Sequence, residues 1–220
     1  MHPTMRLYED VLSSAENVEF GLPPLPRFIF IVHGSARIAG ASLGEGEAWQ
    51  GEKAVTVKPG SGGVTCWRWE LARGDQGSTT ANAPGMTTHE KLTAFLETMP
   101  KGALLMRGDS VAFPPGGRAY LHRHQGPGIR CLIEGGIRID THGRSTSFGP
   151  GGAWYEAGPD PVFAQASLEK PTRFIRVMIL PRELVGKSSI QYINEEDKAK
   201  PKSQEYKIYA DSPISFAMRK

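Results

Sequence analysis

The sequence has little cysteine, no excess of charge of one sign and no long apolar run. Its two cysteines, Cys66 and Cys131, lie far apart in apolar stretches, which excludes a disulfide framework and a CxxC metal or redox pair. The 26 basic and 23 acidic residues are interleaved, so we expect no nucleic-acid partner. No stretch approaches the roughly 18 apolar residues of a membrane span, and the charged N-terminus is unlike a signal peptide. We therefore expect a cytoplasmic protein without a membrane partner.

Turn-forming residues are abundant. The chain of 220 residues contains 26 glycines and 17 prolines, and 39% of its residues are hydrophobic. Many turns in a chain that still has enough apolar residues for a core favour many short strands over long helices. The composition therefore predicts an all-β protein.

The chain contains an internal repeat of three blocks in the same order. The matched segments are IFIVHGSARIAG (29–40) with RCLIEGGIRIDT (130–141), GEGEAW (44–49) with GPGGAW (149–154), and GVTCWRWELA (63–72) with TRFIRVMILP (172–181). One matching hairpin could arise by accident, but three ordered blocks indicate duplication. We therefore predict two related β units.

A short helix is expected between the two units. In MTTHEKLTAFLETMP (86–100), Thr87 or Thr88 offers an N-cap, apolar residues recur at helical spacing, and Pro100 ends the pattern. The predicted organisation is an N-terminal unit over 1–85, a helical connection over 86–100, a C-terminal barrel over 101–183, and a charged connection with a C-terminal strand or tail over 184–220.

The stretch PPGGRAYLHRHQGPGIRCLIEGGIRID carries a motif with two histidines. Gly116, His122 and His124, with Gly135 or Gly136 beyond them, match the spacing of the first motif of the cupin superfamily, which the chain resembles. Cupins (RmlC-like proteins) are double-stranded β-helix barrels of the jelly-roll type. The resemblance implies such a barrel over 101–183 and, through the repeat, a bicupin-type chain.

Several ligand positions of the family motifs lack a ligand in this chain. The glutamate of the first motif falls on Gly128 or Ile129, and the histidine of the second motif falls on Val162. In the N-terminal unit, the histidine positions fall in FGLPPLP (20–26), which has no ligand type. The resemblance therefore implies a degenerate N-terminal unit, whose early strands come from MRLYEDVL near the N-terminus or from YKIYADSPISF near the C-terminus.

His122 and His124 are the predicted metal ligands. Side chains two residues apart on a strand point to the same side, and paired imidazoles suit a divalent transition metal such as Fe, Mn, Ni, Cu or Zn. A metal needs a further donor, and Glu156 is the carboxylate nearest to the broken second motif. We expect Glu156 as a third ligand or a base, with a turn-capping or rim role as the alternative.

Five further residues are candidates for the pocket. Tyr120 shares the histidine face as a catalytic or substrate-orienting phenol, or else packs in the core. Gln125 follows the pair and could reach the substrate, although strict alternation points it away. Cys131 is expected to line the pocket. Tyr155 and Phe163 either line an aromatic mouth or fill the barrel.

Three functions remain open at this point. The first is a metal-dependent cupin enzyme, of dioxygenase, isomerase or lyase type, that acts on a small organic molecule. The second is a metal-free isomerase or epimerase-like cupin in which a histidine is the general base. The third is a non-catalytic cupin that binds a small molecule. We expect a homodimer, because exposed sheet edges need covering, and we expect Arg130 to face solvent or the other unit.

Overall fold

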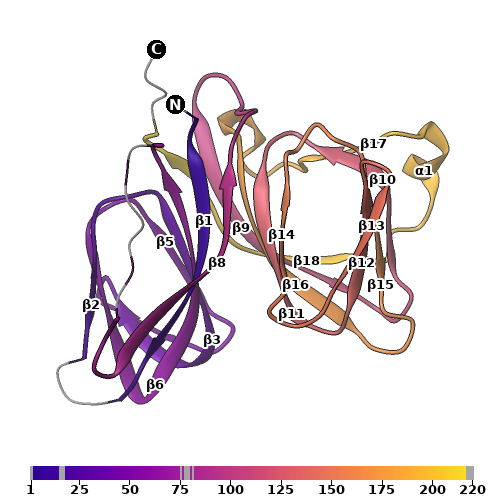
Figure 1. Ribbon diagram of the computed structural model, residues 1–220. Helices are drawn as coiled ribbons and strands as arrows, with labels where there is room; N and C mark the ends of the chain where they lie inside the picture. The colour runs from indigo at the N-terminus through magenta and orange to yellow at the C-terminus, as the bar shows by residue number, and fades with distance from the viewer. Residues whose placement is uncertain (1, 15–17, 75, 77–79, 81, 217–220) are drawn as a thin grey trace. The chain divides into compact units, whose positions relative to one another are not determined.

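The computed structural model describes residues 2–14, 18–74, 76, 80 and 82–216. The described chain separates into two compact units, one reaching Phe95 and including the residues from Ile214 onward, the other spanning Leu96–Pro213. Nearly all regular structure in both units is antiparallel β-sheet (Figure 1). The chain is therefore all-β, as its composition predicts.

The first unit contains one eight-stranded sheet. Its strands are β1 (Thr4–Leu12), β2 (Phe20–Leu22), β3 (Arg27–Ile38), β4 (Ala41–Gly44), β5 (Ala48–Gly51), β6 (Val55–Ala72), β7 (Asn82–Ala83) and β8 (Met86–Phe95). The order β4-β3-β6-β1-β8-β7 places β1 between β6 and β8, while β2 pairs with β6 and β5 with β3. The early strand expected from MRLYEDVL is therefore β1.

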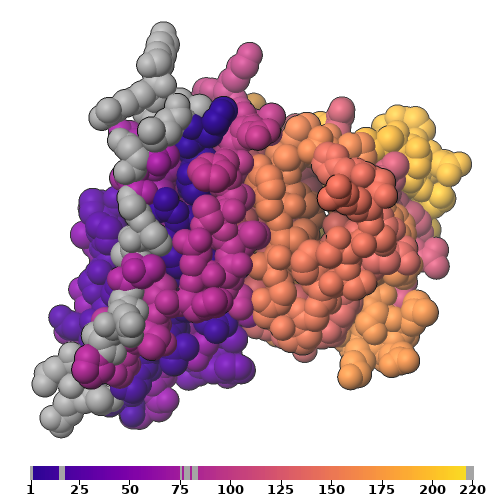
Figure 2. Space-filling view, in the orientation of Figure 1, coloured from indigo at the N-terminus to yellow at the C-terminus, as the bar shows by residue number. Residues whose placement is uncertain are grey.

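The second unit consists of two five-stranded sheets. One has the order β13-β12-β15-β10-β17 and the other β14-β11-β16-β9-β18. Their bounds are β9 (Leu104–Phe113), β10 (Arg118–His124), β11 (Gly128–Glu134), β12 (Ile137–Thr141), β13 (Arg144–Phe148), β14 (Ala153–Glu156), β15 (Val162–Ala166), β16 (Thr172–Pro181), β17 (Ile190–Tyr192) and β18 (Glu205–Ile214). Inward side chains of both sheets share one core. In the space-filling view, atoms of this unit close most of the opening seen in the ribbon (Figure 2).

The helix predicted over 86–100 is wrong. Met86–Phe95 is strand β8, which pairs with the whole length of β1. The residues read as a helical stripe, Leu92, Phe95 and Leu96, do not share one buried face: Leu96 is buried, whereas Phe95 is 66% exposed. Pairing with β1 satisfies backbone groups that would otherwise form an open edge, and this tertiary gain outweighs local helix propensity.

The helices that the structure describes are short and lie in the second unit. They are the 3-10 turn η1 (Arg182–Leu184) and α1 (Glu195–Ala199). No helix in the described ranges has the length and apolar character needed to cross a membrane. The segment from η1 to β18, which the sequence presents as a charged connection, supplies β17 to one sheet and β18 to the other.

The two hairpins aligned by the sequence repeat share a local geometry. Gly34 and Gly135 both have positive φ, at 77° and 81°. A Cβ at Gly34 would lie 2.2 Å from the carbonyl oxygen of Gly63, and one at Gly135 would lie 2.2 Å from that of Pro171. At both positions, glycine is therefore required by the backbone conformation and by the close approach of the strand alongside.

Candidate functional site

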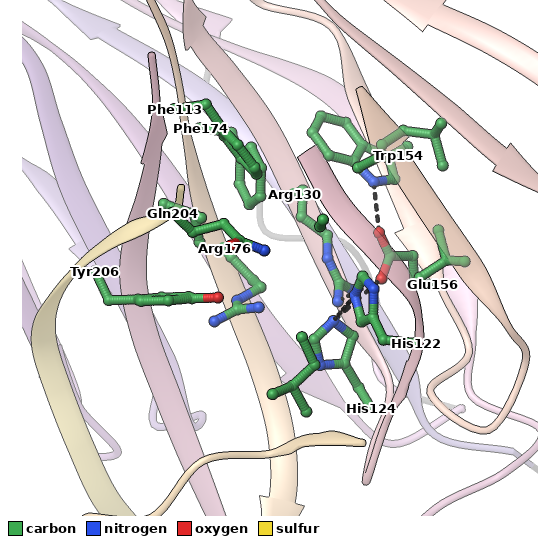
Figure 3. Close-up of a pocket in the computed structure, with 16 residues that line it drawn as sticks. Phe113, His122, His124, Arg130, Trp154, Glu156, Phe174, Arg176, Gln204 and Tyr206 are labelled. Atoms are coloured by element: carbon green, nitrogen blue, oxygen red, sulfur yellow. Dashed lines mark hydrogen bonds and ion pairs between the residues drawn. The ribbon is translucent and has the colours of Figure 1, made fainter. Parts of the chain in front are cut away.

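The histidine pair lies on β10, inside the second unit. Both His122 and His124 are 5% exposed, and their Nε2 atoms are 3.2 Å apart (Figure 3). His122 Nδ1 lies 2.7 Å from the carbonyl oxygen of Tyr120. Because a carbonyl can only accept, Nδ1 carries the proton and the Nε2 lone pair of His122 faces His124. Immediately before β17, the Ser189 hydroxyl lies 3.4 Å from His124 Nδ1.

Two arginines face these histidines from the opposite sheet. Arg130 on β11 is paired in register with Arg176 on β16, which in turn is opposite Asp109 on β9. Arg176 donates to both carboxylate oxygens of Asp109, at 2.9 and 2.7 Å. Arg130 Nη1 donates to the carbonyl oxygen of Gly128 at 2.7 Å. The interior of the barrel is therefore strongly polar on this side.

Glu156 completes the cluster from β14. Its Oε1 accepts a hydrogen bond of 2.9 Å from Trp154 Nε1. Its Oε2 lies 2.7 Å from Arg130 Nη2 in an ion pair and 3.6 Å from His124 Nε2. The angles of the Arg130 contact do not make a hydrogen bond, so this buried oxygen has no hydrogen-bond partner.

Burial and charge set the protonation of this cluster. Burial lowers the pKa of His122, and Glu156 opposes this effect in part. Burial, with the positive charges of Arg130 and Arg176, holds the pKa of His124 well below the usual value. Both rings are therefore neutral near pH 7 and have lone pairs to offer. Burial also lowers the pKa of Arg130 to about 10, so the guanidinium stays charged.

The cluster lines a small cavity between the two sheets. The space open to the centre of a water molecule is about 20 Å³, enough for about one water. The polar end carries the histidines, arginines and Glu156, and the rest of the wall is mainly aromatic and aliphatic. The main apolar lining residues are Val111, Phe113, Ile139, Trp154, Val162 and Phe174. The cavity thus has one polar and one apolar end.

Comparison with solved structures identifies the fold. No protein-family model and no curated protein matches the sequence. A mutant of oxalate decarboxylase from Bacillus subtilis matches with a TM-score of 0.57 and 12% identity, covering 89% of this chain and 73% of that chain. Salicylate 1,2-dioxygenase from Pseudaminobacter salicylatoxidans matches with a TM-score of 0.54 and 11% identity, covering 94% and 75%. Both are cupin-domain proteins.

This chain has the cupin fold. A third similar structure, AerE from Microcystis aeruginosa, has a TM-score of 0.55 and 10% identity and covers 82% of this chain and 93% of its own. At such identities the likeness establishes the fold, and function has to be argued from the site.

The cupin resemblance predicts ligands at two positions that lack them here. Val162 lies opposite His122 in the β10–β15 pairing and lines the cavity without a donor atom. Gly128, where the glutamate of the first motif would fall, is the register partner of Glu156. A carboxylate therefore reaches the histidines from the neighbouring strand, across the position that has no side chain.

The donor atoms of the cluster are of types that bind a divalent metal, although the three side chains lie farther apart than in a formed metal site. Among the described residues, no three His, Cys, Asp or Glu side chains converge closely enough to hold a metal. Nitrogen ligands of one metal, each about 2.1 Å from it, lie roughly 3.0 to 3.4 Å apart. The histidine nitrogens meet this spacing, and the Glu156 oxygen without a hydrogen-bond partner is the nearest third donor. His122, His124 and Glu156 therefore fit a metal in chemical type.

Two residues beside the histidines lie outside the cavity, contrary to their predicted roles. Tyr120 is turned away by a β-bulge between Ala119 and His122, so Ala119 lines the wall and Lys200 lies over the Tyr120 ring. Such a bulge shifts the alternation of side chains by one residue. Gln125 lines a separate surface groove with Met99 and Pro159 instead.

The three other predicted pocket residues also point elsewhere. On β11 the inward residues are Arg130 and Leu132, so Cys131 is buried on the other face of the sheet. Tyr155 alternates with the inward residues of β14, and Phe163 lies between two inward residues of β15 and lines an outer groove. All three were assigned to the wrong side of a strand, because alternation gives a period but not its phase.

Sequence reasoning missed several residues of the cavity. Arg130, expected to face solvent or the other unit, faces the interior, as does Arg176. An arginine inside an apolar strand such as TRFIRVMILP was the available signal, since buried charges need partners. Gln204 and Tyr206 also line the cavity but come from the C-terminal segment, which the local pattern could not place there.

Proposed function

We propose that the second unit is a metal-dependent cupin enzyme that acts on a small organic molecule, with the metal held by His122, His124 and Glu156. The observation that carries this proposal is the 3.2 Å separation of two neutral histidine nitrogens beside a carboxylate oxygen that has no hydrogen-bond partner. The fold is shared with oxalate decarboxylase and salicylate 1,2-dioxygenase, which supports an enzyme without fixing its reaction.

The surrounding residues support the proposed ligand set. Trp154 fixes one oxygen of Glu156, and Arg130 holds the other within 2.7 Å of its guanidinium. Outer contacts of this kind orient ligating carboxylates in metal sites. Tyr120, through its carbonyl oxygen, and Ser189, through its hydroxyl, contact the outer nitrogens of the two rings, which leaves Nε2 of each ring toward the proposed metal.

The division of the cavity indicates how a substrate would lie. A bound divalent metal would act as a Lewis acid or redox centre at the polar end. Phe113, Phe174 and Trp154 offer an apolar wall for the body of the substrate and exclude water from the reacting end. The two arginines and the two carboxylates of the cluster balance in charge, so the positive charge of a bound metal would favour a reacting group that is itself anionic or becomes so.

Metal analysis tests this proposal. Purified protein is incubated separately with Mn²⁺, Fe²⁺, Ni²⁺ and Zn²⁺, freed of loose metal by gel filtration, and analysed for bound metal. We expect about one ion per chain for at least one metal, lost in His122→Ala and His124→Ala. His142→Ala is the matched control, because His142 lies in the same unit with 65% of its side chain exposed.

Two results would contradict the proposal. Wild type that retains none of the four metals removes the metal-dependent reading. Metal affinity that stays unchanged in Glu156→Gln removes Glu156 from the ligand set, since loss of a charged ligand should weaken binding at least tenfold.

A metal-free isomerase is the second candidate, and one observation favours it. His124 can donate from Nε2 to the His122 lone pair at 3.2 Å, while Arg130 neutralises Glu156. The cluster would then be a self-contained acid–base pair, in which a neutral histidine takes a proton from the substrate. Wild type that turns over substrate after exhaustive chelation would favour this candidate.

We also propose a homodimer that forms through a sheet edge. Strand β18 lies at the edge of its sheet and leaves Tyr206 and Ile208 51% and 54% exposed. Pairing with a second chain would cover such an edge. Light scattering should give twice the chain mass, and a monomeric mass at micromolar concentration contradicts the proposal. A cytoplasmic location also remains a prediction.

A further inference from the structure

Gln204 places a side-chain amide in the cavity, and this amide has no hydrogen-bond partner among the described residues. It stands immediately before β18, and its side chain points inward from the C-terminal segment (Figure 3). Both its amide nitrogen and its amide oxygen are buried, and neither has a hydrogen-bond partner. A buried amide that pairs neither its donor nor its acceptor costs stability, and an apolar side chain of similar size would avoid that cost.

The surroundings of Gln204 define what could pair with it. Arg176, also on the cavity wall, is already bound to Asp109 through two hydrogen bonds. The apolar wall of the cavity contains Phe113 and Phe174, whose ring centroids are 6.2 Å apart. No group of the described residues pairs with the glutamine amide, so a group that satisfies it comes from a bound molecule or from water, and the body of such a molecule would lie against aromatic rings.

We infer that the Gln204 amide recognises the ligand of this site, and that the ligand is a flat ring bearing a primary or cyclic amide. Such a group presents a donor and an acceptor side by side, which matches the amide of Gln204 with two hydrogen bonds. The inference deepens the proposed function, because it names the substrate class of the same cavity. It does not depend on which metal, if any, is bound.

Ligand entry requires the segment before β18 to move. The cavity has room for about one water, which is less than any ring needs. Residues 200–203 connect α1 to Gln204, and Pro201 and Lys202 are exposed. The contact between Ser203 Oγ and the backbone nitrogen of Arg118, at 3.1 Å, ties this segment to β10. An outward shift of that short connection would widen the cavity for the ligand while the Gln204 amide still faces it.

Benzamide is the probe that tests this inference, because it combines the ring with a primary amide. Its binding to the full-length protein is measured by NMR titration, with toluene as the probe that lacks the amide. We expect benzamide to bind wild type at least tenfold more tightly than toluene. Gln204→Leu should abolish that preference, and Gln191→Leu, on the exposed part of β17, should keep it. Equal binding of both probes to wild type, or an unchanged preference in Gln204→Leu, overturns the inference.

Thermal unfolding gives an independent readout. If the amide serves only the ligand, Gln204→Leu removes an unpaired polar group and should raise the Tm by about 2 to 4 °C in the absence of ligand. A lower Tm would show that the amide has a structural role and would contradict the inference. Metal content separates the two proposals. If the protein takes up no metal but prefers benzamide, the inference about Gln204 stands and the proposed metal site is contradicted. If the protein binds metal but does not prefer benzamide, the metal site stands and the inference about Gln204 is contradicted.

Discussion

The two units place comparable rows of residues across their sheets, and the rows agree at two of four positions. In the first unit, the residues paired in register across β5, β3, β6 and β1 are Trp49, Ile29, Arg68 and Tyr8. In the second unit, those across β14, β11, β16 and β9 are Trp154, Arg130, Arg176 and Asp109. The rows share the tryptophan and one arginine, whereas Ile29 stands where the second unit has Arg130.

The shared arginine has a shared role. Arg68 donates to both carboxylate oxygens of Asp10, at 2.6 and 3.0 Å, as Arg176 does to Asp109. A buried bidentate pair common to both units belongs to the framework of the fold. Arg130, by contrast, occurs in one unit only, together with the histidines and Glu156, which has Gly51 as its counterpart. The residues found in one row only therefore belong to the candidate site, and the arginine pair found in both units belongs to the framework of the fold.

The largest expected effect comes from breaking the framework pairs. Asp109→Asn leaves the buried Arg176 without its hydrogen-bonded carboxylate, which should lower the free energy of unfolding by about 3 to 5 kcal/mol. Asp10→Asn should cost less, because Arg68 keeps a buried ion pair of 2.7 Å with Glu70. Hydrogen exchange followed by mass spectrometry can report each unit from its own peptides. Asp140→Asn, in a partly exposed pair with Arg138, is the control and should change stability by less than about 0.5 kcal/mol. Equal losses in the two units would show that Glu70 does not compensate Arg68.

The second prediction concerns the residue that distinguishes the rows. Arg130→Ile copies the first unit and leaves Glu156 without its counter-ion, whereas Glu156→Gln leaves Arg130 uncompensated. Each should cost about 2 to 4 kcal/mol, and the double variant should cost about 1 to 3 kcal/mol less than the sum. Urea unfolding of the four proteins gives the coupling energy. A coupling near zero would mean that the two side chains do not act as a pair.

The repeat explains how far the sequence could predict this comparison. The alignment of 29–40 with 130–141 already matched Ile29 with Arg130, as the strand registers do. The third block, 63–72 with 172–181, was aligned one residue off, because the registers pair Arg68 and Arg176 with those two residues. The pairings with β3 and β11 both contain a bulge at the corresponding place, between Ile31 and His33 and between Leu132 and Glu134, so the bulge does not account for this offset.

The same limit applies to the individual site residues. His122 and His124 were predicted correctly as an inward pair, since two residues on one strand need only the period. Placing Tyr120 and Cys131 required knowing which face of the strand each residue occupies. A bulge changed that face for Tyr120, and the loop between β10 and β11 changed it for Cys131. Gln204 needed the tertiary path of the C-terminal segment. Fold class, by contrast, follows from composition and repeats, which do not depend on phase.

Acid should affect the two units differently in the metal-free protein. His122 and His124 are buried, and burial lowers the pKa of both, with Arg130 and Arg176 adding to the effect and Glu156 opposing it at His122. The unfolded chain takes up protons near pH 6.5 that the native site refuses, so stability is full above that pH and is lost as pH falls below it. Hydrogen exchange from pH 7 to pH 5 should show this loss in the second unit.

The first unit supplies the control for the acid effect. Its histidines that the structure describes, among them His33 and His89, are exposed and should contribute no comparable loss. The double variant His122→Gln/His124→Gln should flatten the pH dependence of the second unit. An equal slope in wild type and variant would assign the acid sensitivity to other groups.

The smallest expected effect concerns the tryptophan that both rows share. Trp154 donates a hydrogen bond of 2.9 Å to Glu156, whereas Gly51 stands at the corresponding place beside Trp49 and has no side chain to accept one. A hydrogen bond to a carboxylate is worth about 1.5 to 3 kcal/mol, so Trp154→Phe should cost at least that much more than Trp49→Phe, because Trp154 is also the more deeply buried ring. Urea unfolding measures both variants. Because Trp154 also orients the proposed third ligand, Trp154→Phe should weaken metal binding about tenfold. Trp49→Phe should leave metal binding unchanged. Equal effects of the two variants on metal binding would mean that the shared tryptophan belongs to the framework alone.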